Sequence, residues 1–140
     1  MPDGMDLERF VAAQDPVIGQ VRQELAAGRK RTHWMWFVFP QLRGLGQSAM
    51  AQRYGLASLA EAQAYLAHPV LGPRLEDCTA LVNAVQGRSA EEILGGVDAM
   101  KFRSCMTLFA AVRPGDSPFR TALAQYFEGE PDPRTLAMLP

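Results

Sequence analysis

Residues 30–46, KRTHWMWFVFPQLRGLG, constrain the fold more than any other part of this chain. The stretch contains both tryptophans of the protein, Trp34 and Trp36, together with Phe37 and Phe39. Each large aromatic side chain buries about 150–250 Å² when packed, so leaving several of them in water is costly. The stretch therefore belongs to the core, lines a binding site, or does both.

The local conformation of this stretch is ambiguous from its pattern, because a short apolar run suits a buried strand as well as a helix. No second segment reads as a strand that would pair with residues 33–39, and a lone strand leaves its backbone groups unsatisfied. We therefore expect a short helix that ends at Pro40, with Thr32 as a candidate cap. Gly44 and Gly46 then favour a loop.

Helical signals recur along the rest of the chain. Apolar residues step by three and four positions at Leu71, Leu75, Cys78 and Val82, as on the buried face of a helix. Short polar residues that can cap a helix precede most of the apolar segments: Asp6, Asp15, Ser48, Ser58, Ser89, Asp98, Ser117 and Asp132. Ser58 with Glu61, and Ser89 with Glu92, have the spacing of capping boxes. The pattern predicts an all-α fold, with residues 1–140 as a single compact domain of about seven to nine short helices.

Charge is unevenly distributed along a chain whose net charge is only −1. Between Glu24 and Glu61 there is no carboxylate, and the basic residues inside this window are Arg29, Lys30, Arg31, Arg43 and Arg53. A region of one sign is a candidate docking surface for an anion. The alternative is a segregation along the sequence that evens out in three dimensions. The near-neutral balance argues against a nucleic-acid partner.

The cysteines and the N-terminus bear on the cellular compartment. Cys78 and Cys105 lie in apolar helical segments without CxxC spacing, so we expect buried thiols and a reducing environment. The N-terminal MPDGMDLERF lacks an apolar signal core, and no apolar run approaches the roughly 20 residues that span a bilayer. We expect a cytoplasmic protein with no membrane partner. No motif for a metal or a cofactor is present, so neither is expected.

The basic-aromatic stretch is the first candidate site. Arginines grip phosphate bidentately and aromatic faces stack on planar rings, so the combination suits a nucleotide-like anion. The residues that would serve are Arg29, Lys30, Trp34, Trp36 and Arg43. His33, inside the stretch, is a candidate general acid or base because the ordinary pKa of histidine lies near neutral pH. A core role for the aromatics and a surface role for the charges remain the alternatives.

A second candidate site lies at the head of a predicted helix. Asp98, Lys101 and Ser104 are spaced three apart, so they share one helix face. Gly95 and Gly96 allow a ligand to approach that end. The alternative is a capping aspartate, a surface ion pair and a serine used in helix packing.

Four segments resemble domain-of-unknown-function family 1810: DLERFVAAQ at 6–14, GRKRTHWMWFVFPQLRGLG at 28–46, SLAEAQAYLAHPVLGPRL at 58–75 and DAMKFRSCMTLF at 98–109, and the closing FEGEPDPRTLAML at 127–139 fits too. Where that family commonly has two serines, this chain has Ser104 and Cys105, which weakens a hydroxyl role at 105. The resemblance implies an all-α fold and no established activity. A label borrowed from calpastatin in some members does not suit this compact globular pattern. A weaker likeness is to NADAR domains, which cleave N-glycosidic bonds in ADP-ribose or phosphoribosyl-linked substrates.

Together these observations predict a pocket between residues 29–46 and the start of the 98–112 helix. It would bind a small anionic metabolite, nucleotide-like or ribose-phosphate-like. The catalytic candidates are His33, Asp98 and Lys101, and the ligand-binding candidates are Arg29, Lys30, Trp34, Trp36, Arg43 and Ser104. N-glycosidic hydrolysis is the reaction to test, although the sequence leaves open whether the protein is an enzyme, and its oligomeric state. The alternative is a non-catalytic interaction module that docks an acidic protein.

Overall fold

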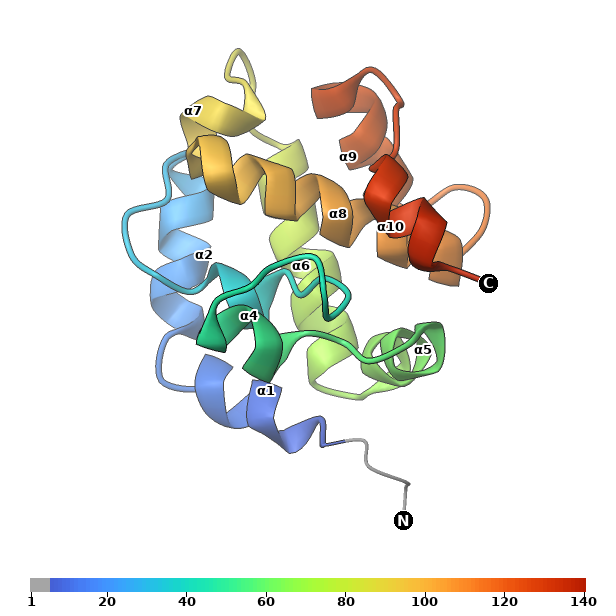
Figure 1. The fold of residues 1–140 in the computed structure, drawn as a ribbon. Coiled ribbons are helices and arrows are strands. Elements are labelled where there is room, and N and C mark those ends of the chain that lie inside the picture. The colour runs from blue at the N-terminus through green and yellow to red at the C-terminus, as the bar shows by residue number, and fades with distance from the viewer. Residues whose placement is uncertain (1–5) are drawn as a thin grey trace.

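The computed structural model describes residues 6–140, which form ten α-helices and no β-strand (Figure 1). The first five residues of the N-terminal stretch MPDGMDLERF lie outside the described part. The helices are α1 (Glu8–Gln14), α2 (Ile18–Ala26), α3 (Met35–Val38), α4 (Ala49–Tyr54), α5 (Leu59–Ala67), α6 (Leu71–Asn83), α7 (Ala90–Leu94), α8 (Gly96–Val112), α9 (Pro118–Phe127) and α10 (Pro133–Met138). The predicted all-α fold is confirmed, with one helix more than the upper end of the expected range.

Helix α8 is the central element of the fold. It packs against α5, α7, α9 and α10, while α6 packs against α2, α5 and α9 (Figure 1). The middle of α8, residues 104–109, is buried without interruption, as is typical of a helix surrounded by other helices. Its first turns, in contrast, carry the exposed side chains of Val97 and Met100. The buried half of α8 thus builds the core, and its N-terminal end faces solvent.

The aromatic stretch forms a short helix, as expected, and most of it is core. Trp34, Met35, Phe37 and Phe39 are buried, whereas Trp36 is half-buried. The ring of Phe39 meets the ring of Phe102 on α8 edge to face, with the centroids 5.0 Å apart. This contact joins the stretch to the centre of the molecule.

The serine caps are confirmed, together with that of Asp132. Ser48, Ser58, Ser89 and Ser117 each accept a hydrogen bond from the backbone amide three residues on. Ser89 and Glu92 form the full capping box. The box predicted at Ser58 is half formed, because the Glu61 carboxylate accepts from the amide of Ala57 rather than from that of Ser58.

Four other predicted caps are wrong. Helix α1 begins after Leu7, so Asp6 does not cap it, and Asp15 ends that helix instead of starting α2. Thr32 does not cap α3, since its hydroxyl donates to the Glu24 carboxylate. Helix α8 begins at Gly96, which places Asp98 inside the first turn. The helix starts are shifted relative to the predicted ones at Asp6, Asp15 and Asp98, and at Thr32 a tertiary partner takes the hydroxyl.

Candidate functional site

A buried carboxylate on α2, Glu24, organises the start of the aromatic stretch. It is 3% exposed and accepts five hydrogen bonds: from the Arg31 amide at 2.7 Å, the Thr32 amide at 3.1 Å, the Thr32 hydroxyl at 2.7 Å, the Trp34 indole N–H at 2.9 Å and the Gln20 amide group at 2.9 Å. A carboxylate accepts up to four or so bonds on its lone pairs, so this one is saturated. The loop between α2 and α3 is thereby held in place by the Glu24 carboxylate.

The pKa of Glu24 reflects this environment. Burial by itself would raise the pKa, because it disfavours the charged form. The bonds from Arg31, Thr32, Gln20 and Trp34 outweigh burial and lower the pKa from 4.5 to about 2. Glu24 is consequently an anion that holds the loop in place, with no lone pair left over for a ligand.

A second carboxylate, Asp98, joins the aromatic stretch to α8. Its two oxygens lie 2.9 Å from Lys30 Nζ and 3.6 Å from Lys101 Nζ. Each ammonium also lies over an indole, with Lys30 5.1 Å from the ring centroid of Trp34 and Lys101 5.2 Å from that of Trp36. Contacts between a cation and the face of an indole are favourable. The structure thus brings five of the predicted site residues into one layered cluster.

The two tryptophans of this cluster differ in exposure. Trp34 is 1% exposed, and its indole N–H is used by Glu24, so a ligand has no access to it. Trp36 is half-buried and lines a small cavity of about 10 Å³, together with Gln41, Tyr54 and Lys101. A volume of that size accommodates about one water molecule. Of the two, Trp36 is the one placed beside open space.

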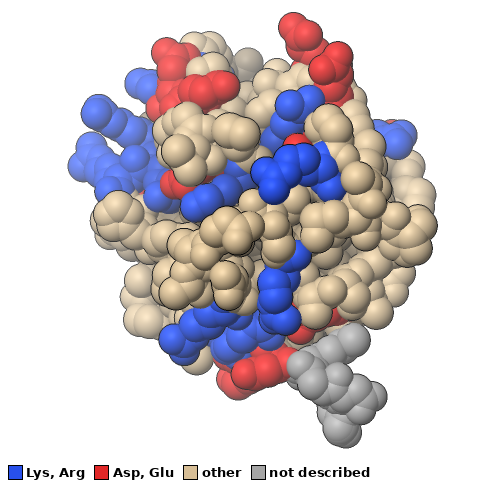
Figure 2. Space-filling model, viewed as in Figure 1, with Lys and Arg blue, Asp and Glu red and all other residues tan. Residues whose placement is uncertain are grey.

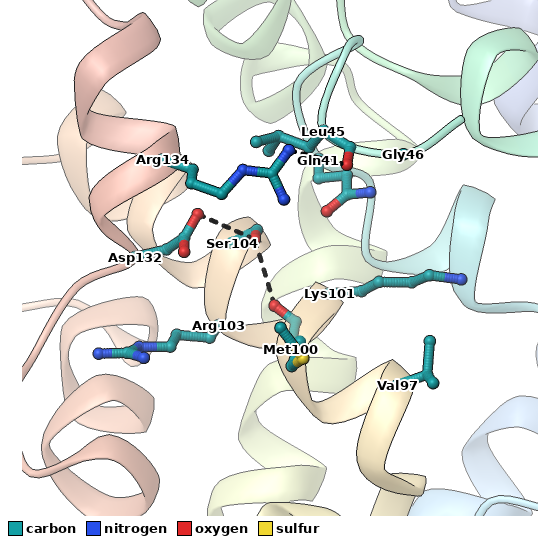
Figure 3. A pocket seen from close by; sticks show the side chains of 10 residues that line it. All are labelled: Gln41, Leu45, Gly46, Val97, Met100, Lys101, Arg103, Ser104, Asp132 and Arg134. Carbon is teal, nitrogen blue, oxygen red and sulfur yellow. Dashed lines mark hydrogen bonds between the residues drawn. The ribbon is translucent and has the colours of Figure 1, made fainter. Parts of the chain in front are cut away.

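The main groove near this cluster has a volume of about 280 Å³ and lies between the 41–46 loop, the start of α8 and the start of α10 (Figure 3). It is lined by Gln41, Leu45, Gly46, Val97, Met100, Lys101, Arg103, Ser104, Asp132 and Arg134. Figure 3 shows Arg134 extending toward Gln41 and Leu45, and its Nη2 lies 3.4 Å from the Leu45 carbonyl oxygen. Lys101 and Gln41 border both the groove and the small cavity beneath Trp36.

The floor of the groove is a polar network around Asp132. Ser104 Oγ lies 3.2 Å from Asp132 Oδ2, which also accepts from the amide and the hydroxyl of Thr135 at 3.0 and 2.5 Å. The Asp132 amide donates to Thr107 Oγ1 at 2.8 Å. Ser104 thus lines the groove, and its hydroxyl lies 3.2 Å from both the Met100 carbonyl oxygen and Asp132 Oδ2 rather than beside Asp98 or Lys101.

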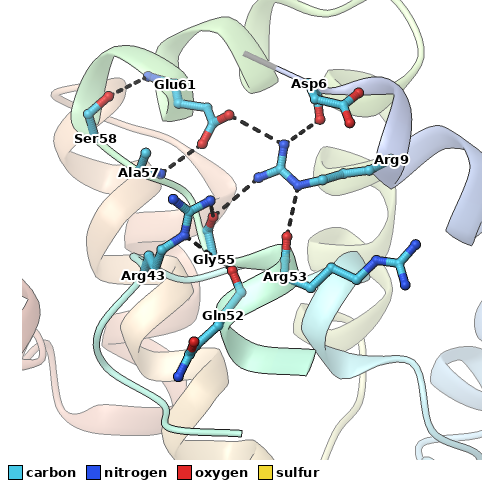
Figure 4. Close-up of polar contacts among 9 residues, drawn as sticks. All are labelled: Asp6, Arg9, Arg43, Gln52, Arg53, Gly55, Ala57, Ser58 and Glu61. Atoms are coloured by element: carbon cyan, nitrogen blue, oxygen red, sulfur yellow. Dashed lines mark hydrogen bonds and ion pairs between the residues drawn. The ribbon is translucent and has the colours of Figure 1, made fainter. Parts of the chain in front are cut away.

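The remaining predicted residues lie elsewhere. His33 and Arg29 are exposed on the loop after α2. Arg43 donates to the carbonyls of Gln52 and Gly55 at 3.2 Å each (Figure 4). Arg9 reaches the same Gly55 carbonyl and pairs with Glu61 at 3.4 Å. The charge of Arg43 is thus used to hold the segment that follows α4, and the structure does not bring it to Asp98.

Sequence reasoning missed four residues of the site. Asp132 was assigned only a cap, and Gln41 and Arg134 carry no motif. Glu24 was noticed only as the border of the carboxylate-free window, although a lone acidic residue before such a basic segment is itself a signal for an internal ion or hydrogen-bond partner. Figure 2 shows that basic side chains lie at the upper left and across the middle of this face, and that acidic ones lie mostly toward its margins.

Within residues 6–140, no helix combines the length and the apolar character needed to cross a bilayer. In the same range, no three His, Cys, Asp or Glu side chains gather in a way that would hold a metal ion.

Comparisons with known proteins point to one family. A model described as "Protein of unknown function (DUF1810)" matches residues 4–139. The chain is similar to the conserved hypothetical protein Rv1873 from Mycobacterium tuberculosis, whose crystal structure is known. The two sequences are 60% identical, and the structures superpose with a TM-score of 0.95 over 98% of each chain. No curated protein gives a significant match, and nothing found supports the likeness to NADAR domains. The chain belongs to the DUF1810 family.

Proposed function

We propose that this protein binds a small anionic metabolite, of the nucleotide or ribose-phosphate type, in the groove between the 41–46 loop, α8 and α10. The observation that carries the proposal is that two basic residues, Lys101 and Arg134, line one concave site of about 280 Å³. Ligand pockets are concave and mostly apolar, with a few convergent polar groups. Leu45, Val97 and Met100 supply apolar surface here.

The two basic side chains are suited to a phosphate group. Arg134 is exposed, and a guanidinium offers five N–H donors in a planar fork that matches phosphate oxygens bidentately. Lys101 is oriented by Asp98 on one side and by the Trp36 ring on the other, so little conformational freedom is lost when a ligand binds. Arg103, which also borders the groove, is engaged by Glu130 at 3.7 Å.

N-glycosidic hydrolysis is the reaction that belongs to this ligand class. Water would add at the anomeric carbon of the ribose as the bond to the base nitrogen breaks. The proton lost by the water goes to the leaving base when that base is adenine, and to solvent when it is the nicotinamide of NAD, which leaves as a neutral molecule. Asp98 is the carboxylate considered for stabilising the cationic centre. Because both of its oxygens face an ammonium group, its charge is already compensated, and the contacts support binding more directly than cleavage.

Isothermal titration calorimetry with ribose 5-phosphate, ADP-ribose and NAD tests the proposal. We expect saturable binding of at least one of them, weakened about tenfold or more by Lys101→Gln and by Arg134→Gln, because each variant removes a charged donor. Arg120→Gln is the matched control, since Arg120 is exposed on α9 and lies outside the groove. Release of nicotinamide from NAD or of adenine from ADP-ribose, followed by chromatography, tests cleavage in the same samples.

The second candidate function is a protein-interaction module, and exposed apolar side chains favour it. Val97 and Met100 are 70% and 71% exposed at the rim of the groove, and Leu136 on α10 is 47% exposed. Apolar patches rimmed by polar residues are typical of interaction sites. If the folded protein binds none of the three compounds, the metabolite proposal is wrong and this second function is favoured.

A further inference from the structure

We propose that Asp132 recognises a hydroxyl group of the bound metabolite, so that the ligand is a sugar phosphate or mononucleotide with a free vicinal diol. The phosphate binds at Arg134 and Lys101, and the diol donates to the Asp132 carboxylate. This inference rests on the proposed function and narrows it to a substrate class.

The Asp132 carboxylate is held rigidly from two helices. Ser104 on α8 lies 3.2 Å from Oδ2, and Thr135 on α10 binds the same oxygen through its amide and its hydroxyl. The backbone of Asp132 is fixed as well, through Thr107. A functional group locked in this way loses little freedom on binding, which is what a recognition group requires.

The second carboxylate oxygen is unused. All of the bonds above involve Oδ2 or the backbone, and within residues 6–140 Oδ1 has neither a hydrogen-bond donor nor an ion-pair partner. Asp132 is half-buried and lines the groove (Figure 3). A carboxylate is purely an acceptor when ionised, so the group that it meets in a ligand must be a donor.

The charges of the lining residues indicate which end of the ligand binds where: the phosphate end at the basic residues and the hydroxyl end at Asp132. Among the lining residues, all within 6–140, Asp132 is the only carboxylate. It repels a phosphate group and accepts hydrogen bonds from hydroxyl groups, whereas Arg134 attracts the phosphate group. A volume of about 280 Å³ lies at the lower end of ligand pockets, which favours a ligand of sugar-phosphate size over a dinucleotide.

Titration calorimetry with ribose 5-phosphate and 2-deoxyribose 5-phosphate tests the inference, because the two compounds differ by one hydroxyl. We expect the wild-type protein to bind ribose 5-phosphate about tenfold more tightly. Asp132→Asn should weaken this preference, because a neutral amide group makes a weaker hydrogen bond to a hydroxyl than a carboxylate does. Asparagine caps a helix as well as aspartate does, so its oxygen retains the bonds from Ser104 and Thr135 while its amide group replaces Oδ1.

The outcomes separate the two proposals. If the wild type binds both sugars equally, or if Asp132→Asn retains the preference, the inference is wrong and the metabolite site remains. If neither sugar binds, the proposed function fails and the inference fails with it. Arg120→Gln should bind both sugars as the wild type does, and a thermal melt of Asp132→Asn establishes that the variant is folded.

Discussion

At the scale of single residues, Glu24 is the group on which the site depends most. Its hydrogen bonds are made within the protein: it holds Trp34 through the indole N–H, and Lys30 lies over the Trp34 ring. Lys30 in turn reaches Asp98 on α8. A buried carboxylate with a full set of donors is stabilising only while it is charged.

Replacing this carboxylate should be costly. Glu24→Gln keeps the shape but turns one acceptor oxygen into an N–H₂ group that faces donors. A pKa lowered from 4.5 to about 2 corresponds to about 3 kcal/mol, so we expect a loss of that order in the free energy of unfolding at pH 7. Urea denaturation followed by circular dichroism measures it. Gln63→Glu, at an exposed position of α5, is the reference for a change of the same chemical type and should stay within about 0.5 kcal/mol.

The pH dependence of this loss follows from the same shift. Because the pKa in the folded protein is depressed, the stabilisation is complete above the unfolded value of 4.5 and is lost as the pH falls through 4.5 toward about 2. The difference in unfolding free energy between the wild type and Glu24→Gln should therefore shrink over this range. A difference that stays constant from pH 7 to pH 3 would show that the charge of Glu24 is not the cause.

At the scale of elements, the corner between α7 and α8 positions both ends of the ion-pair cluster. Gly95 connects the two helices with φ +94° and ψ 156°, a conformation that essentially only glycine adopts without strain. The Ile93 carbonyl, just before this corner, accepts from the Lys30 amide at 2.7 Å. Asp98 lies in the first turn after it. The corner thus sets Lys30 and Asp98 at pairing distance.

Adjacent glycines at this corner provide a matched test. Gly95→Ala should lower the free energy of unfolding by about 1–3 kcal/mol, because alanine is strained at this φ and ψ. Gly96→Ala should change it by less than about 1 kcal/mol, since Gly96 has no positive φ and an added Cβ would meet open space. Thermal and urea unfolding of both variants compare them directly. If Gly95→Ala and Gly96→Ala changed the free energy of unfolding equally, the backbone conformation at Gly95 would not require glycine.

At the scale of the whole molecule, one core of aromatic and aliphatic side chains unites the helices. Phe102 at its centre meets Phe39 from the aromatic stretch and Phe127 from α9. Cys78 and Cys105, both fully buried, belong to this core as free thiols. Burial raises the pKa of the Cys78 thiol from 9.0 to about 11 and that of Cys105 well above its ordinary value.

Thiol reactivity therefore reports on opening of the core. The thiolate is the reactive form, and at pH 8 little of it is present in the folded protein. We expect both cysteines to react with a disulfide reagent at least about a hundredfold more slowly than in urea-unfolded protein. Stopped-flow absorbance measures the two rates. A rapid phase from either thiol in the folded protein would contradict the packing described for Cys78 and Cys105.

The sequence alone determined the helical fold, the family and the helices whose caps are local. Ser48, Ser89, Ser117 and Asp132 were all placed correctly, since a capping bond spans only three residues and depends on little else. The expectation of a short buried helix in the aromatic stretch also held, at Met35–Val38, and within residues 6–140 no β-strand is present that could pair with it.

Only the tertiary structure decided which polar groups meet. Asp98 pairs with Lys30, Ser104 lies beside Asp132, and Arg43 shares the Gly55 carbonyl with Arg9. These partners are far apart along the chain, so neither spacing nor helix periodicity relates them. Leaving a buried charge without a partner costs far more free energy than breaking a local helix preference. The pairing of polar groups between α2, α8 and α10 therefore takes precedence over local caps. At Asp98, the cap that the sequence suggested is replaced in this way.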